Sequence, residues 1–232
     1  MPLSYLLLFI TTLAVLFGFT HRVLDRMRMT DTWALIIIIG MIIGTFLPNI
    51  HITKLVSVNI GGALIPIGVS IYLFMKADST AEKLNAVIVS IISGILVYIA
   101  GVFLPHEPEA MLIEPNYIYG IIGGLISYLF GRSRRCAFIA GVMGIVLSGV
   151  IQAFVNYFTG RNAVVPIGGA GSFDAVVISM IIAVFLSEVI GETREKLQGG
   201  TLKKDSHVKQ IPLKNLKDDI LHLKKDKGDE DE

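Results

Sequence analysis

Residues 84–104 read LNAVIVSIISGILVYIAGVFL, 21 residues without a charged side chain. A helix that crosses the hydrocarbon core of a bilayer needs about 20 mainly apolar residues, so this stretch predicts a transmembrane helix. Six further apolar segments resemble it, and two short ones are flanked by Trp33 and Tyr117, aromatic residues typical of the membrane interface. We therefore expect an all-α, polytopic integral membrane protein with seven transmembrane helices. The seven segments are 3–19, 33–47, 55–75, 84–104, 117–130, 137–158 and 175–190.

The composition agrees with a membrane domain followed by a soluble tail. Only 17% of the 232 residues are charged, and the mean hydropathy is +0.69, whereas soluble domains carry about 25% charged residues. Half of the 20 Lys and Arg residues, and ten of the 19 acids, follow Gly191. The expected organisation is a transmembrane domain at 1–191 and a cytoplasmic tail at 192–232. The net charge of +1 predicts no nucleic-acid partner.

The tail contains one amphipathic stretch. Residues 211–225 carry Leu213, Leu216, Ile220 and Leu223 at helical spacing, with lysines on the other faces. Such a helix can lie on the inner leaflet, or pack on this chain or on a partner protein. The acidic end, DKGDEDE at 226–232, predicts disorder.

The basic residues of the short loops predict the orientation. With the N-terminus outside, eight Lys and Arg residues fall in inner loops, and only Lys54 and Arg161 fall in outer loops. This bias follows the positive-inside rule and puts the C-terminal tail in the cytoplasm. The first segment lacks a basic flank and a small-residue cleavage site, so we expect it to stay as an anchor. The inner residues are Arg22, Arg26, Arg28, Lys76, Lys83, Arg132, Arg134 and Arg135.

Two glycine motifs predict interrupted helices. NIGGALIP at 59–66 and PIGGAGSF at 166–173 share Ile-Gly-Gly-Ala, and both run inward from outside. Pro66 has no N–H to donate, and Gly61 and Gly62 weaken the same turn. Paired breaks in parallel helices indicate a parallel internal repeat with a site between its halves. The alternative is that the glycines only permit close helix packing.

Asp174 is an acid at the edge of the last apolar segment, and two interpretations stay open. Together with Ser172 it can cap that helix. It can also face Asn59 across an outward-facing polar pocket, lined too by the sixth helix, that holds a cation, a proton or a polar solute. The candidate binding residues are Asn59, Gly61, Gly62, Gly169, Gly171, Asp174, Gln152 and Asn156.

No catalytic or metal-binding motif accompanies these residues, and we expect no enzyme, cofactor or metal. The acidic loop at 105–115, with His106, is interpreted as solvated rather than metal-binding. Intramembrane aspartyl proteases use Gly-x-Gly-Asp and a second buried aspartate, but Gly169 and Gly171 lie two residues too far from Asp174. The favoured functions are a small transporter or ion-binding permease and, alternatively, a non-catalytic scaffold or regulator acting through its tail. An intramembrane hydrolase is the least favoured.

The segments VNIGGALIPIGVSIYLF and GGAGSFDAVVISMIIAVFLSE resemble an uncharacterised family of prokaryotic multi-pass membrane proteins, a domain of unknown function. The resemblance implies a bacterial or archaeal cytoplasmic membrane. It also implies that an Asn-x-Gly-Gly segment and a Gly-Ala-Gly-x-Phe-Asp segment belong to the family pattern, but it implies no activity. The residues in that pattern are Asn59, Gly61, Gly62, Gly169, Gly171 and Asp174.

Overall fold

The computed structural model describes residues 3–18, 20–104, 114–131, 133–169 and 172–197. It is mostly helical, and each apolar segment expected from the sequence contains a helix. The chain divides into two compact units, Met1–Ile190 and Gly191–Glu232. Of the second unit only the end of the last helix is described, so the expected amphipathic helix at 211–225 lies outside the described residues. The helices are α1 (Leu3–Leu16), α2 (His21–Met27), α3 (Asp31–Thr45), α4 (Ile65–Met75), α5 (Thr80–Phe103), α6 (Pro115–Phe130), α7 (Arg134–Phe158) and α8 (Ser172–Leu197), with a π-helical turn η1 (Ile60–Leu64) directly before α4.

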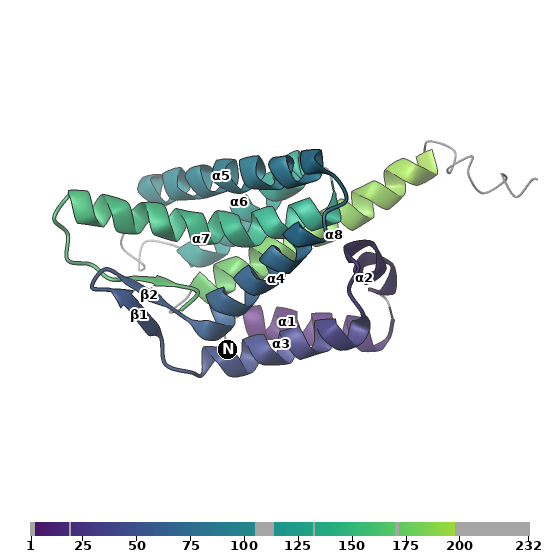
Figure 1. Cartoon of the computed structure of the whole chain (residues 1–232), viewed down its shortest axis with the longest axis horizontal. Helices are drawn as coiled ribbons and strands as arrows, with labels where there is room; N and C mark the ends of the chain where they lie inside the picture. The colour runs from purple at the N-terminus through teal and green to yellow at the C-terminus, as the bar shows by residue number, and fades with distance from the viewer. Residues whose placement is uncertain (1–2, 19, 105–113, 132, 170–171, 198–232) are drawn as a thin grey trace, which may run out of the picture. The chain divides into compact units, whose positions relative to one another are not determined.

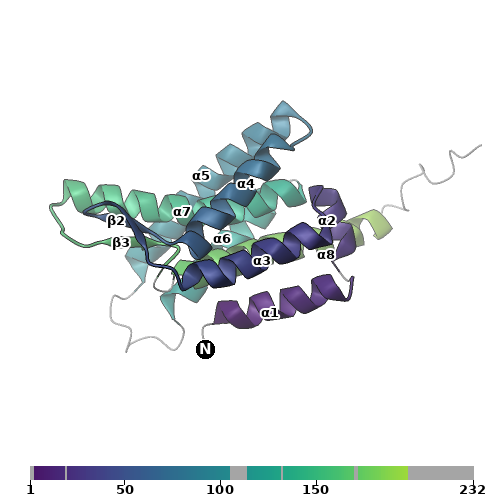
Figure 2. The same ribbon diagram turned by 60° about the horizontal axis from the view of Figure 1, so that its bottom comes forward.

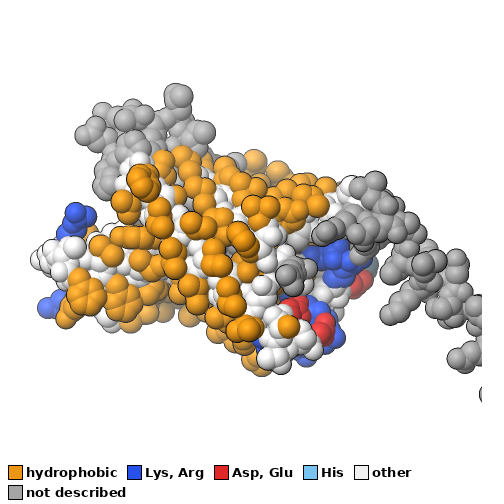
Figure 3. Space-filling view, turned by 90° about the horizontal axis from the view of Figure 1, so that it is seen from above, with side chains coloured by type: hydrophobic (Ala, Val, Ile, Leu, Met, Phe, Trp, Pro, Cys, Tyr) orange, Lys and Arg blue, Asp and Glu red, His pale blue; other side chains and the backbone are white. Residues whose placement is uncertain are grey.

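Three helices are long and apolar enough to cross a membrane. They cover Thr80–Phe103, Arg134–Phe158 and Phe173–Gly191. The apolar helices Ser4–Leu16, Asp31–Thr45 and Ile60–Met75 are shorter. Many large apolar side chains of α5 are exposed, and Figure 3 shows hydrophobic side chains across the middle of one face with charged side chains at its two ends. Length and composition together indicate a membrane protein.

Polar side chains begin several of these helices. The hydroxyl groups of Thr30, Ser79 and Ser133 accept hydrogen bonds from backbone N–H groups in the first turns of α3, α5 and α7. Such caps satisfy donors that a helix leaves unpaired at its start. Ser79 and Ser133 therefore fix where the two longest helices of the first unit begin.

A small β-sheet corrects the expectation of an all-α chain. Strands β1 (Ile50–Thr53) and β2 (Val56–Val58) form an antiparallel hairpin, and β3 (Val165–Ile167) pairs with β2 in parallel. Residues 55–58, expected at the start of a transmembrane helix, are thus largely strand. Isoleucine, valine and threonine suit strands as well as apolar helices, and the partner strand lies more than 100 residues away. Figures 1 and 2 show the sheet and α2 at opposite ends of the first unit.

Ion pairs gather at the end that carries α2. The guanidinium of Arg28 lies 2.5 Å from Asp78, and Arg135 pairs with the same carboxylate. Arg135 also donates to the backbone carbonyl of Lys76, at 2.5 Å. The pKa of Asp78 is lowered from its ordinary value of 3.8, first by the hydrogen bond from Arg135 and then by the charges of Arg135 and Arg28. The segments after α2 and α4 and the first turn of α7 are therefore connected through one carboxylate.

Candidate functional site

The parallel pairing of β2 with β3 brings the two glycine motifs side by side. Val58 pairs with Ile167, and the N–H of Asn59 donates to the carbonyl of Ile167 at 3.0 Å. Each strand leads through glycines into a helix. β2 is followed by η1 and α4, and β3 is followed by α8. The two segments thus share direction and order of elements.

The glycines of the two motifs touch through their backbones. A Cβ on Gly62 would lie 2.7 Å from the carbonyl carbon of Gly168 and collide with its oxygen. Gly168 has φ +72°, a left-handed conformation that favours glycine, and its Cβ would collide with Ala63. Gly61 packs in the same way against α3, where a Cβ would lie 2.6 Å from the carbonyl carbon of Gly44. Close packing accounts for Gly61 and Gly62.

The irregular turn at Gly61 and Gly62 is the start of a helix rather than a break within one. Asn59 caps η1, its side-chain oxygen accepting from the N–H of Gly62 at 2.9 Å. The carbonyls of Asn59 and Ile60 accept the i→i+5 hydrogen bonds typical of a π-turn. Pro66 is the second residue of α4, directly after η1, and has no N–H to donate to the carbonyls of that turn. The expected helix therefore begins later than the start of its segment at 55–75, because residues 56–58 are strand, and its irregular turn lies at Ile60–Leu64.

Asn59 has a second side-chain partner. Only 4% of its surface is exposed, and its amide nitrogen donates to the side-chain oxygen of Asn49 at 2.9 Å. Asn49 follows Pro48 between α3 and β1. The two amides thus hold the loop after α3 against the glycine turn.

Asp174 connects the start of α8 with the start of α1. It is 5% exposed, and its Oδ1 accepts hydrogen bonds from the backbone N–H of Ser4, at 3.2 Å, and from the Ser4 hydroxyl. Asp174 therefore caps α1, whereas the sequence predicted a cap on its own helix. Its place in the first turn of α8 also suits the positive end of that helix dipole. The side chain of Ser172 lies outside the described residues.

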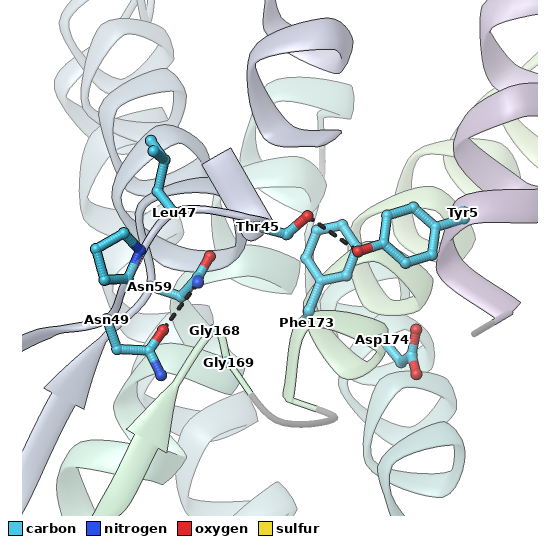
Figure 4. Close-up of a pocket in the computed structure, with 10 residues that line it drawn as sticks. Tyr5, Thr45, Leu47, Asn49, Asn59, Gly168, Gly169, Phe173 and Asp174 are labelled. Atoms are coloured by element: carbon cyan, nitrogen blue, oxygen red, sulfur yellow. Dashed lines mark hydrogen bonds between the residues drawn. The ribbon is translucent and has the colours of Figure 1, made fainter. Parts of the chain in front are cut away.

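Asn59 and Asp174 line one pocket, of about 360 Å³, at the sheet end of the first unit. Tyr5 lines it too: its hydroxyl lies 3.0 Å from that of Thr45, and its ring packs on that of Phe173 with centroids 5.6 Å apart. Figure 4 shows the Asn49–Asn59 pair on one side of the pocket and Asp174 on the other. The lining residues are Tyr5, Thr45, Leu47, Pro48, Asn49, Asn59, Gly168, Gly169, Phe173 and Asp174. We call this cavity the polar pocket.

The other expected site residues are not all brought to the polar pocket. Gln152 and Asn156 line a separate cavity of about 580 Å³ on the other side of Gly168. Gln152 donates to Asn156 at 2.9 Å, and Asn156 donates to the carbonyl of Ala163 at 3.0 Å. These amides therefore hold the loop before β3, and the expectation that they share a pocket with Asp174 is not met. Gly171 lies outside the described residues.

Sequence reasoning missed several polar and aromatic residues of the site, among them Tyr5, Thr45, Asn49 and Phe173 of the lining and Ser4, the partner of Asp174. Serine and threonine in an apolar helix usually bond to their own helix, and Thr45 does so too, donating to the carbonyl of Ile42 at 2.7 Å. These residues therefore carry no signal of their own. Asn49 did carry a signal in the sequence, because an amide side chain between apolar segments needs a hydrogen-bond partner when it is buried.

Comparison with known proteins identifies a family without assigning an activity. No curated protein and no solved structure matches the chain. One family, described as "Protein of unknown function (DUF1614)", matches residues 13–186. The match covers Asn59, the paired glycines and Asp174, and it starts after Ser4 and Tyr5. Because it spans about three quarters of the 232 residues, the chain belongs to this family of unknown function.

Proposed function

We propose that this chain is a seven-span protein of the prokaryotic cytoplasmic membrane, with its N-terminus outside and its tail inside. Two sets of contacts support this orientation. The sheet joins segments expected outside, through Val56 and Val165. The ion pairs join segments expected inside, through Arg28, Asp78 and Arg135.

The shorter helices are compatible with seven spans. α1, α3 and α6 contain 14, 15 and 16 residues, which corresponds to about 21–24 Å at 1.5 Å per residue. A bilayer core of about 30 Å adapts to short helices by local thinning and by flanking residues that reach the interface. Trp33, 62% exposed in the first turn of α3, is such a flanking residue.

We further propose that the polar pocket binds a cation or a small polar solute, and that the protein is a small transporter or permease. The observation that carries this proposal is that Asn59 and Asp174, from the two motif segments, line one pocket. The hydroxyls of Tyr5 and Thr45 and the amide of Asn49 add hydrogen-bonding groups around it. A carboxylate has about four acceptor positions, and both hydrogen bonds from Ser4 go to Oδ1. Asp174 thus keeps acceptor capacity for a ligand.

The pocket supports binding better than hydrolysis. An aspartyl hydrolase needs two carboxylates that share a proton. Among the described residues that line the pocket, Asp174 is the one acid, and Asp78 is engaged by arginines at the opposite end. The proposed role is therefore non-enzymatic.

Flux through reconstituted liposomes tests this function. Wild type should pass Na⁺, K⁺ or H⁺ above protein-free liposomes, or be stabilised by one of these cations. Asp174→Asn should lose the effect, because the neutral amide keeps an oxygen for Ser4 but not the charge. Asp25→Asn in α2, whose side chain is exposed, is the matched control. Equal flux and equal cation response in wild type and Asp174→Asn would leave Asp174 only its capping role.

A further inference from the structure

A third cavity, of about 470 Å³, lies among α1, α2, α3, α4 and α8. Its walls are aliphatic, methionine and phenylalanine side chains, among them Leu8 and Val15 of α1, Ile38 of α3 and Met180 of α8. Along α8 the lining extends from Met180 to Val189, about 13 Å at 1.5 Å per residue. This volume is typical of small-ligand sites. We call the cavity the apolar slot; Figure 2 shows the course of α1, α3 and α8, with α2 near one end of α1 and α3.

One end of the apolar slot is polar. Thr20, which precedes α2, and Glu188 of α8 both line it. The Glu188 carboxylate accepts a hydrogen bond from Nε of Arg134, a side chain that is 15% exposed. The Thr20 hydroxyl and Nη2 of Arg134 are buried and have no hydrogen-bond partner in the described part of the chain.

A hydrogen-bond acceptor for the Thr20 hydroxyl and for Nη2 of Arg134 would have to come from outside the described residues. Three buried side-chain atoms in the described part of the chain lack a partner: the hydroxyl of Thr20, which lines the slot, Nη2 of Arg134, whose Nε bonds to the slot-lining Glu188, and the hydroxyl of Ser127. Nη2 of a guanidinium can only donate, and a hydroxyl can donate as well. Burying such donors unpaired is costly, so an oxygen-bearing ligand is favoured.

The position of the slot indicates the kind of ligand. Its polar end lies at α2, on the side where Arg28, Asp78 and Arg135 pair and where we expect the inner headgroups. An empty apolar space loses dispersion contacts with its walls, and acyl chains surround a membrane protein at this depth. A free phosphate would meet the donors and leave the slot empty, whereas a phospholipid supplies both parts.

We propose that the apolar slot binds one acyl chain of an inner-leaflet phospholipid, whose phosphate or ester oxygens accept from Nη2 of Arg134 and the hydroxyl of Thr20. The inference depends on the membrane location proposed above and not on a ligand for the polar pocket. It assigns α1 a second role, since one face of this helix closes the slot.

Native mass spectrometry of the detergent-purified full chain, titrated with dioleoylphosphatidylglycerol, tests the proposal. Wild type should retain one lipid per chain, and glycerol phosphate, the headgroup without chains, should not bind. Ala14→Trp fills the slot and should lower lipid retention at least five-fold. Leu13→Trp places the same ring one position away, at a side chain that is 37% exposed and outside the slot, and should retain the lipid.

Two conservative variants test the polar end without filling the slot. Arg134→Lys keeps a positive charge beside Glu188 and loses Nη2, and Thr20→Val loses the hydroxyl at nearly constant shape. Each should lower lipid retention by two-fold or more at an unchanged Tm without lipid. Unchanged retention in both variants, or equal retention in the two tryptophan variants, overturns the proposal. Binding of glycerol phosphate as tight as that of the lipid overturns it as well, because the site would then recognise an anion alone.

Discussion

Gly62 and Gly168 are in backbone contact, although they lie in different motifs at the starts of different helices. The contact joins η1, which leads into α4, to the segment that leads into α8, and it lies directly beside the polar pocket. Any side chain at either position must push these two segments apart. The geometry of the pocket therefore depends on both residues being glycine.

Alanine at Gly62 should destabilise the fold. Its Cβ would meet the backbone of Gly168, which cannot move like a flexible side chain, and overpacking of this kind costs about 1–3 kcal/mol. The expected result is a lower Tm in detergent. Gly68→Ala in α4 is the matched control, because a Cβ there meets nothing within 4 Å. Equal Tm values for the two variants would contradict the contact.

Removing the link between Asp174 and Ser4 should loosen α1. A hydrogen bond to a charged group contributes about 1.5–3 kcal/mol, and Asp174 and Ser4 share two. Asp174→Ala and Ser4→Ala should each lower Tm, and the double variant should lose less than the sum of both. Asp174→Asn should stay close to wild type in Tm, because its side-chain oxygen can still accept. Additive losses in the double-mutant cycle would show that the two side chains act independently.

The Asp78 carboxylate predicts how stability responds to acid. Its pKa lies below 3.8, chiefly because of the hydrogen bond from Arg135, so the folded state holds the charged form more tightly than the unfolded state does. The resulting stabilisation is present above the ordinary value of 3.8 and is lost as the pH falls through the lower pKa of the folded protein. Thermal unfolding of wild type and Asp78→Asn should therefore differ at neutral pH, and the difference should shrink as the pH falls below 3.8. A constant difference across this range would exclude the titration of Asp78 as its cause.

The proposed orientation can be tested with single cysteines. In a Cys136→Ser background, Ile52→Cys in β1 should react with a membrane-impermeant maleimide in intact cells, and Ala81→Cys at the start of α5 should not. Both positions are exposed, so access decides the result. After the cells are permeabilised, both cysteines should react. Labelling of Ala81→Cys in intact cells would reverse the orientation.

The helices could be located from the sequence because hydrocarbon imposes a simple requirement. A long apolar run must pair its own backbone groups, and a helix does this within one segment. Each of the seven apolar segments accordingly contains a helix in the structure. The predicted start of the third segment was wrong, because its backbone found a hydrogen-bond partner outside the helix: residues 56–58 form β2 and pair with the strand at 165–167.

The candidate site was predicted in part. The similarity of the two glycine motifs indicated that Asn59 and Asp174 lie near each other, and both line the polar pocket. Their hydrogen-bond partners Asn49 and Ser4 could not be inferred, because nothing in local sequence says which distant group a buried amide or carboxylate meets. For the same reason Gln152 and Asn156, placed on the correct half of their helix, were assigned to the wrong cavity.

The sequence by itself determined which segments are apolar and helical, and where the charges and glycines lie, because these depend on composition and local spacing. Only the tertiary structure decided what the motifs do. It placed the irregular turn at Gly61 and Gly62 in the first turn of a shorter helix, capped by Asn59. It also gave the carboxylate of Asp174 to the first turn of α1. Both outcomes depend on contacts between segments more than 100 residues apart, β2 with β3 and Ser4 with Asp174, that no local pattern encodes.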